Sequence, residues 1–325
     1  MTLQAPSAAC GRSSNRDAGM TIADFRQVRA KIQPYIRTTP LVPSNLPDVF
    51  LKLETLQHTH SFKVRGAFAR VHDLVETGDK RTILTVSAGN HGLGIARAAS
   101  TFKLPCVVIV PNSAPKTKID GIRKYGVELR LEGANYDEAE DRVLHLAENS
   151  KDYVFVSPYN DPLVILGQGT LGFEILEQLP EVEAVVVPIG GGGLASGVAA
   201  VVKELCPRIR IIGVQAEASA AMYHSLKAGK MLKVPDLPSV ADGIAGNIDL
   251  NTITFPMIQR YVDEVVLVSE VEIESSMKRL LHQEKLVTEG SAAAAYAAME
   301  HGKFHAGKPV VVVLTGANTM SPVLS

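Results

Sequence analysis

The sequence predicts a protein of the α/β class, built from parallel sheets that are covered by helices. Short runs rich in β-branched residues alternate with helical patterns along most of the chain, which is typical of parallel strands joined by helices. Four consecutive valines, Val310–Val313, are typical of a strand that is buried on both faces. Four consecutive glycines, Gly190–Gly193, separate an apolar strand-like segment from a helical one. A chain of 325 residues is long enough for two lobes.

The expected elements follow in chain order. Thr21-Ile22-Ala23-Asp24 resembles a capping box, and the apolar residues after it recur at helical spacing, so we expect a first helix there. The expected strands are short apolar runs at 49–53, 82–86, 106–110, 128–131, 153–156, 185–188, 210–215, 264–268 and 310–314. The expected helices between them span 91–100, 116–125, 136–149, 194–205 and 271–284.

Composition and charge exclude several classes of protein. The formal net charge is −1 and no basic tract is present, so we expect no nucleic-acid partner. No apolar run is long enough to span a bilayer, and residues 1–19, which lack the apolar core of a signal peptide, are predicted to be a disordered extension. Cys10, Cys106 and Cys206 are isolated, which suits a reducing compartment. We therefore expect a soluble cytoplasmic protein without a membrane partner.

One lysine stands where a covalent cofactor would need an amine. Lys63 lies in Ser61-Phe62-Lys63-Val64-Arg65-Gly66, between the strand-like Val49–Leu53 and a helical pattern. A neutral amine is the nucleophile that an aldehyde requires, and burial lowers the pKa of a lysine toward that form. A single such lysine is more often a solvated surface residue. Lys52 competes with it, but its alternation pattern is that of an ordinary strand residue.

Two further motifs lie at strand-to-helix junctions. Gly190–Gly193 would let the backbone surround an anion, and the helix that starts at Leu194 would add free N–H donors and a favourable dipole. The alternative is a tight turn. The run is not a Walker loop and lacks the G-x-G-x-x-G spacing, although Glu217 leaves a nicotinamide enzyme as a minor alternative. Ser87-Ala88-Gly89-Asn90-His91 would also present backbone N–H groups.

In this order, the three motifs resemble the threonine/serine dehydratase branch of the fold-type II pyridoxal-phosphate enzymes. The resemblance covers about Met20 to Asn318. It implies a tryptophan synthase β-like fold of two parallel-sheet α/β lobes, with a small domain at 82–160 inserted into a large domain made of 20–81 and 161–325. The cofactor would lie in the cleft between them. The family expectation is a homodimer, and about ten residues after the last strand leave no room for a C-terminal regulatory domain.

The resemblance also implies the roles of individual residues. Lys63 would hold pyridoxal 5'-phosphate as a Schiff base and then act as base on the substrate Cα–H, with Phe62 beside the ring. The other residues expected to bind the cofactor are Gly190, Gly191, Gly192, Gly193, Leu194, Asn90, Gly243 and Thr315. Those expected to bind the substrate carboxylate are Ser87, Ala88, Gly89, Asn90 and His91. A loop histidine such as His91 is more often merely exposed.

Three positions refine the expected reaction. Thr315 would place a neutral hydroxyl against the pyridine nitrogen, which favours prompt expulsion of the β-substituent. Serine racemases have a serine where this chain has Ala88, and alanine cannot deliver a proton to the opposite face, so elimination is favoured over racemisation. Tyr223 replaces an acid that some relatives use, with Glu217 and Ala221, to bind a divalent cation. A phenol is a poor ligand for such ions, and we expect no metal.

The resemblance predicts an ammonia-lyase that converts a β-hydroxy-α-amino acid to a 2-oxo acid and ammonia. Val64, where sulfhydrylase-type relatives usually carry Asp or Asn, sorts the chain with the dehydratases. His60 replaces a glycine that is common in relatives, which suggests phenylserine as the substrate; if His60 points away, threonine or serine is expected. Glu289-Gly290-Ser291 resembles an acidic loop near the cofactor, or caps the next helix. A racemase of the serine racemase type and a non-catalytic amino-acid sensor are the alternatives.

Overall fold

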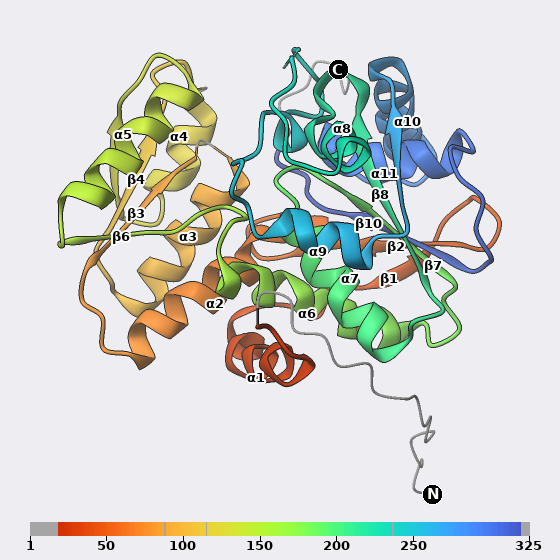
Figure 1. Cartoon of the computed structure of the whole chain (residues 1–325), viewed down its shortest axis with the longest axis horizontal. Helices are drawn as coiled ribbons and strands as arrows, with labels where there is room; N and C mark the ends of the chain where they lie inside the picture. The colour runs from red at the N-terminus through yellow and green to blue at the C-terminus, as the bar shows by residue number, and fades with distance from the viewer. Residues whose placement is uncertain (1–18, 88, 115, 236, 320–325) are drawn as a thin grey trace, which may run out of the picture.

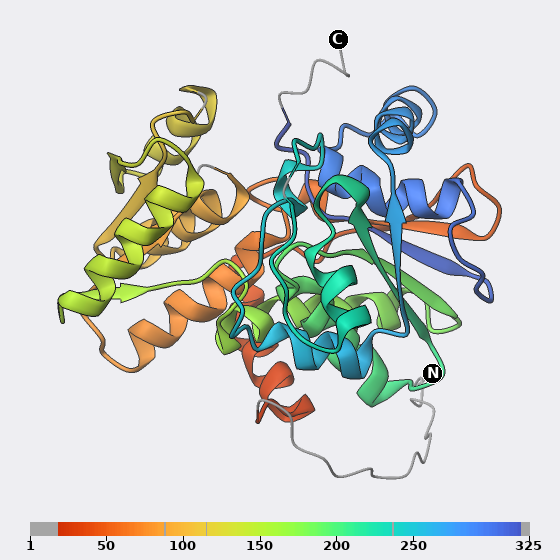
Figure 2. The ribbon, with the colours of Figure 1, turned by 45° about the horizontal axis from the view of Figure 1, so that its top comes forward.

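The structure confirms the predicted α/β class. It is a computed structural model that describes residues 19–87, 89–114, 116–235 and 237–319. Two lobes lie side by side, each with a sheet of its own (Figures 1 and 2). The predicted disordered extension, residues 1–19, lies outside the described residues except for Gly19, and Ala88 lies outside them as well.

The larger sheet has the strand order β1-β2-β10-β7-β8-β9. All of its neighbouring pairs are parallel except β1 with β2. Its strands are β1 Leu41–Pro43, β2 Val49–Leu53, β7 Ala184–Pro188, β8 Arg210–Ala216, β9 Glu264–Val268 and β10 Val310–Leu314. The smaller sheet is parallel throughout, with the order β5-β4-β3-β6. Its strands are β3 Thr82–Val86, β4 Cys106–Val110, β5 Glu128–Leu131 and β6 Tyr153–Phe155.

Helices cover both faces of the larger sheet, which explains the valine run in β10. Val310 and Val312 pack with α10 (Glu270–His282) and α11 (Gly290–Glu300) on one face. Val311 and Val313 pack against α6, α7, α8 and α9 on the other face. These four helices span α6 Pro162–Gln178, α7 Gly193–Leu205, α8 Ala221–Ala228 and α9 Thr254–Tyr261. Successive strand residues point to opposite faces, so a strand covered on both sides is apolar throughout.

The remaining helices define the smaller lobe and its junction with the larger one. The smaller sheet packs with α3 Asn90–Phe102, α4 Lys116–Arg123 and α5 Tyr136–Asn149. Helix α2 (Lys63–Glu76) packs against both α3 and α6 and therefore lies between the lobes (Figure 1). Helix α1 (Ile22–Ile32) begins with the predicted capping box, in which Thr21 Oγ1 accepts from the Asp24 backbone N–H and Thr21 N donates to the Asp24 carboxylate.

Most predicted strands match the structure to within one residue, and the helices to within two. The sequence pattern did not reveal α6, the longest helix among the described residues. Almost all of its residues from Val164 to Ile175 are buried, so no polar face marks its period. Gly167 and Gly169 let it approach α2 and α1 closely, because a Cβ at Gly167 would lie 2.6 Å from the Arg65 carbonyl oxygen.

Candidate active site

Lys63 is the first residue of α2, and its side chain reaches the segment that follows β6. Its Nζ donates to the Pro158 carbonyl oxygen at 2.9 Å, and lies 5.3 Å from the centroid of the Phe62 ring. Burial lowers the pKa of Lys63 to about 8, although the charge of Glu289 acts in the opposite direction. A far larger fraction of this amine is therefore neutral near pH 7 than of an ordinary lysine.

The segment before Lys63 is held against the end of β10. Ser61 and Gly316 form an isolated antiparallel bridge, and Phe62 N donates to the Thr315 carbonyl oxygen at 3.0 Å. Ala317 N donates to the His60 carbonyl oxygen at 2.9 Å. Thr315 is buried, with 2% of its surface exposed. This pairing brings the Thr315 backbone next to Phe62, the residue before the lysine.

A hydrogen-bonded chain crosses from the larger lobe to Asn90, at the start of α3. Asn90 Nδ2 lies 2.8 and 2.9 Å from the two carboxyl oxygens of Glu289. Asn90 Oδ1 accepts from Asn318 Nδ2 at 2.7 Å. Both ends of the amide therefore have partners, which fixes its orientation. Glu289 stands at the N-cap of α11 without capping it through its side chain, and burial raises its pKa to about 7. Glu289 was expected either in a loop near the cofactor or as a cap of the next helix, and this geometry favours the loop near the cofactor.

The four glycines form the connection from β7 to α7. Gly192, the N-cap of α7, has φ +88°, which is favourable only for glycine, and no side chain caps the helix. The first backbone N–H groups of α7, which includes Leu194, are thus left without a side-chain cap. A Cβ on Gly191 would overlap the Tyr159 ring, and one on Gly190 would lie 3.0 Å from Ile244 Cα. Only glycine fits this closely packed loop, as a phosphate cradle requires.

A family model described as "Pyridoxal-phosphate dependent enzyme" matches residues 32–316. This chain belongs to that family. L-threonine ammonia-lyase of Thermotoga maritima is 41% identical over 305 residues, which cover 92% of this chain and 76% of that protein. The crystal structure of a T.th. threonine deaminase has a TM-score of 0.84 and 34% identity, over 93% of this chain and 100% of that one. Maize serine racemase has a TM-score of 0.86 and 30% identity, over 92% and 93%.

The comparisons confirm the fold-type II architecture, the pyridoxal 5'-phosphate cofactor and the ammonia-lyase class of this family member. When bound, the cofactor supplies an electron sink that makes the substrate Cα–H acidic. The residues present fit it: Lys63 offers a buried amine, and the start of α7 offers donors for a phosphate. Ser291 Oγ is buried without a hydrogen-bond partner among the described residues, and a Cβ at Gly243 would lie 2.7 Å from it. An unpaired buried hydroxyl of this kind suits a ligand.

His91 is buried, whereas a loop histidine of this kind was expected to be exposed. It belongs to the first turn of α3, with 4% of its surface accessible. Its Nε2 lies 3.1 Å from the Val156 carbonyl oxygen, so we assign the proton to Nε2. Burial lowers the pKa of His91 to about 3, and Nδ1 has no hydrogen-bond partner among the described residues. A neutral ring with one free acceptor remains. Nearby, Ser87 Oγ accepts from the Gly89 backbone N–H at 3.0 Å.

Lys52 is also not the ordinary strand residue that the sequence suggested. Its side chain is fully buried, and its Nζ lies 2.7 Å from Glu174 Oε2. Burial lowers its pKa, but the amine is held in an ion pair within the larger lobe. The pattern could not show this, because the partner lies 122 residues further along the chain. Lys52 is therefore no rival to Lys63.

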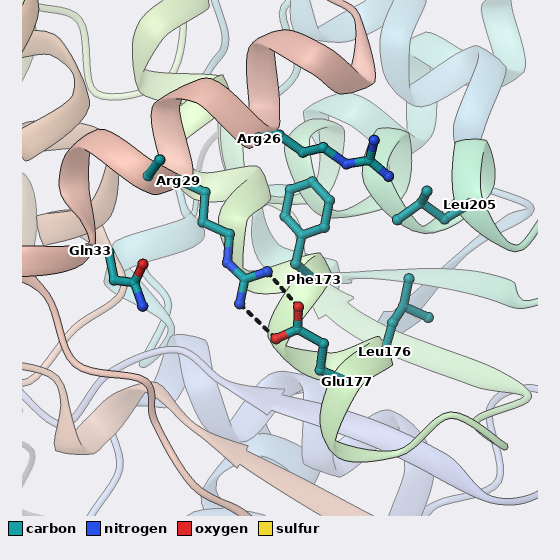
Figure 3. Close-up of a pocket in the computed structure, with 8 residues that line it drawn as sticks. Arg26, Arg29, Gln33, Phe173, Leu176, Glu177 and Leu205 are labelled. Carbon is teal, nitrogen blue, oxygen red and sulfur yellow. Dashed lines mark hydrogen bonds and ion pairs between the residues drawn. The ribbon is translucent and has the colours of Figure 1, made fainter. Parts of the chain in front are cut away.

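The structure also describes the surroundings of Tyr223 and a surface cavity. Lys227 Nζ lies 4.2 Å from the centroid of the Tyr223 ring. No group of three or more potential metal-ligating side chains occurs within the described ranges. A surface cavity of about 580 Å³ opens between α1, α6 and α7, beside the Arg29–Glu177 ion pair (Figure 3). It shares no lining residue with the site around Lys63.

Sequence reasoning overlooked Pro158, Tyr159 and Asn318. Pro158 and Tyr159 belong to Ser157-Pro158-Tyr159-Asn160-Asp161, which follows β6 and returns the chain to the larger lobe. The Tyr159 hydroxyl accepts from the Asp249 backbone N–H at 3.0 Å, which fixes the ring over Gly191. The sequence signal that was available is this polar, proline-containing segment directly after a buried strand. Among the described helices, none is long and apolar enough to span a membrane.

Proposed function

We propose that the enzyme eliminates water from a β-hydroxy-α-amino acid and releases a 2-oxo acid and ammonia. Lys63 takes the proton from Cα, the Cβ–O bond breaks, and the departing hydroxyl takes up one proton, so that the elimination releases one water. The enamine that departs tautomerises and is hydrolysed, so water is first released and then consumed, without net oxidation or reduction. The observation that carries this proposal is the buried amine of Lys63, which donates to the Pro158 carbonyl oxygen and whose pKa burial lowers to about 8.

The other site residues have binding and orienting roles in this proposal. The loop Gly190–Gly193 and the start of α7 would hold the cofactor phosphate, and Thr315 would offer its hydroxyl to the ring nitrogen. The N–H groups around Ser87 and Gly89 hold the substrate carboxylate. Asn90, oriented by Glu289 and Asn318, contacts the cofactor's phenolic oxygen. Elimination is proposed over racemisation because Ala88 has no hydroxyl with which to return a proton to the opposite face.

Threonine and serine are the substrates that the geometry supports best. His60 was the reason to expect a larger substrate, and its Nδ1 lies 3.3 Å from the Thr55 carbonyl oxygen, on the side of the 3-10 helix Glu54–Leu56. The relatives reported above include threonine enzymes at 34–41% identity. A ring that lies toward Thr55 removes the reason to expect a substrate larger than threonine or serine.

Phenylserine is a second candidate, favoured by the backbone of His60. Its φ of +54° is a conformation that glycine adopts without strain, yet the chain carries an exposed histidine three residues before Lys63. Strained residues tend to persist where they have a function. An exposed imidazole at this place could stack on the phenyl ring of the substrate.

One panel of assays tests the proposal. The purified enzyme with pyridoxal phosphate is given L-threonine, L-serine, phenylserine and 3-hydroxyaspartate, and 2-oxo acid and ammonia are measured. Equal amounts of both products from at least one substrate support the proposal, and Lys63→Ala should abolish them. Formation of a D-amino acid without ammonia would identify a racemase, and binding without turnover a sensor. A higher ratio of phenylserine to threonine turnover in the native enzyme than in His60→Gly supports the second candidate.

We also propose that the enzyme works in the cytoplasm as a homodimer with no partner other than its amino-acid substrate. The dimer is the family expectation. Light scattering on the holoenzyme should give twice the chain mass of 34.8 kDa. A mass of one chain at micromolar concentration would contradict it.

A further inference from the structure

Beneath the start of α2 lies a fully buried network of charged side chains. Arg65, two residues after Lys63, has no exposed surface. Its Nε and Nη2 donate to Glu54 at 2.7 and 2.8 Å. Its Nη1 donates to Glu174 at 2.7 Å and to Thr170 Oγ1 at 3.2 Å, and Nη2 also reaches the Arg37 carbonyl oxygen at 3.4 Å. All five N–H donors of the guanidinium therefore have an acceptor.

Lys52 completes the same network from β2. Its Nζ donates to Glu174 Oε2 at 2.7 Å, to the Thr39 carbonyl oxygen at 2.6 Å and to Gln178 Oε1 at 2.8 Å. These are all three donors of an ammonium group. The two cations, Lys52 and Arg65, balance the two carboxylates, Glu54 and Glu174, so the buried group carries no net charge. We call these four residues the buried quartet.

The buried quartet is a costly way to obtain stability alone. Moving charges out of water is expensive, and an apolar cluster of similar volume is often as stable or more so. What a fully paired network does supply is a defined position, because planar, bidentate hydrogen bonds hold only in one geometry. Here they join β2, the 3-10 helix Glu54–Leu56, α2 and α6.

The first turn of α2 has no side-chain cap, because Phe62 makes no capping bond, and Lys63 N donates to Ser61 Oγ at 3.3 Å. The residues before this turn are paired with the end of β10, and Arg65 ties the turn itself to the core. Arg65 lies in this turn and points into the core, whereas Lys63 reaches toward Pro158, in the segment that follows β6. A shift of Arg65 would therefore carry the Lys63 backbone with it.

We propose that Arg65 is a positioning residue for the reaction, and that the buried quartet holds the Lys63 amine in register with the cofactor. It acts through α2 and touches neither cofactor nor substrate. The proposal deepens the proposed function and rests on it for the identity of the reaction. Because the charges of the buried quartet balance, the quartet fixes the position of Lys63 without placing a net charge beneath it.

The test compares Arg65→Lys with Arg29→Lys. Arg29 also forms a bidentate pair, with Glu177, but on the surface and outside the site. Lysine keeps the charge and cannot make five planar hydrogen bonds. In Arg65→Lys we expect pyridoxal phosphate affinity, measured on the apoenzyme by cofactor fluorescence, to fall at least tenfold, and the absorbance maximum of the bound cofactor to shift. We expect kcat to fall 10- to 100-fold with KM within threefold. Arg29→Lys should match the native enzyme.

A milder variant keeps the proposal testable if Arg65→Lys does not fold. Thr170→Val keeps the shape of the side chain and leaves one donor of Arg65 unpaired, and it should lower cofactor affinity two- to fivefold. Native affinity, spectrum and kcat in the folded fraction of either variant would overturn the proposal, even if its melting temperature fell. Cofactor affinity and spectrum are measured without substrate. An absence of dehydration in the native enzyme would therefore refute the proposed function and leave this comparison intact.

Discussion

The pH dependence of cofactor capture follows directly from the buried amine. With a pKa of about 8, roughly a tenth of Lys63 is neutral at pH 7, against about one part in three thousand for an ordinary lysine. Only the neutral amine attacks an aldehyde. The rate at which the apoenzyme captures pyridoxal phosphate should therefore rise with pH, reach half its maximum near pH 8, and level off about one unit higher.

Glu289→Gln is the perturbation that separates this explanation from a general effect of pH. The charge of Glu289 raises the pKa of Lys63, so its removal should move the midpoint below that of the native enzyme. Glutamine keeps an oxygen that can accept from Asn90. The assay is stopped-flow absorbance of the apoenzyme mixed with pyridoxal phosphate from pH 6 to 10.5, with Glu177→Gln, in the exposed Arg29 pair, as the control. A native midpoint near 10.5, or one that rises in Glu289→Gln, would refute the reasoning.

Three further predictions concern stability and the glycine loop. His60→Gly should raise the free energy of unfolding by up to about 1 kcal/mol, because it removes the strain of a left-handed backbone conformation at a histidine. A thermal melting midpoint that is unchanged or lower in the variant would contradict this prediction. Gly191→Ala should weaken pyridoxal phosphate binding at least tenfold, because the added Cβ would overlap the Tyr159 ring. The apoenzyme of the variant is titrated with pyridoxal phosphate, and an affinity equal to that of the native enzyme would contradict the prediction. Because the pKa of Glu289 is raised to about 7 in the folded state, its stabilising contribution is present below pH 4.5 and is lost as the pH rises to about 7. Over this range the free energy of unfolding should fall by about 3 kcal/mol relative to Glu289→Gln. Urea titrations of both proteins at several pH values measure this difference.

The strands were predictable because their burial imposes a local pattern. β10 is apolar at every position since helices cover both of its faces, and the glycine run marked the turn into α7. Helix α6 was not predictable in this way. It is enclosed on all sides, so its sequence has no alternation of apolar and polar faces.

The contacts of the site were hidden for a different reason. Glu289 lies 199 residues from Asn90, and Pro158 lies 95 residues from Lys63. No periodicity in a single sequence reports such pairs. His91 was read as a loop histidine without a visible partner, which is usually exposed, whereas it lies in α3 with its ring buried near the Val156 carbonyl oxygen. Charged residues such as Arg65 also read as surface residues, because only their distant partners make burial tolerable.

The covalent attachment of the cofactor tests the central claim most directly. The holoenzyme is reduced with borohydride, digested with trypsin and examined by mass spectrometry. We predict that the mass of reduced pyridoxal phosphate appears on Lys63, and that Lys63→Ala protein treated in the same way carries none. An unmodified Lys63, or the added mass on Lys52 or another lysine, would contradict the account.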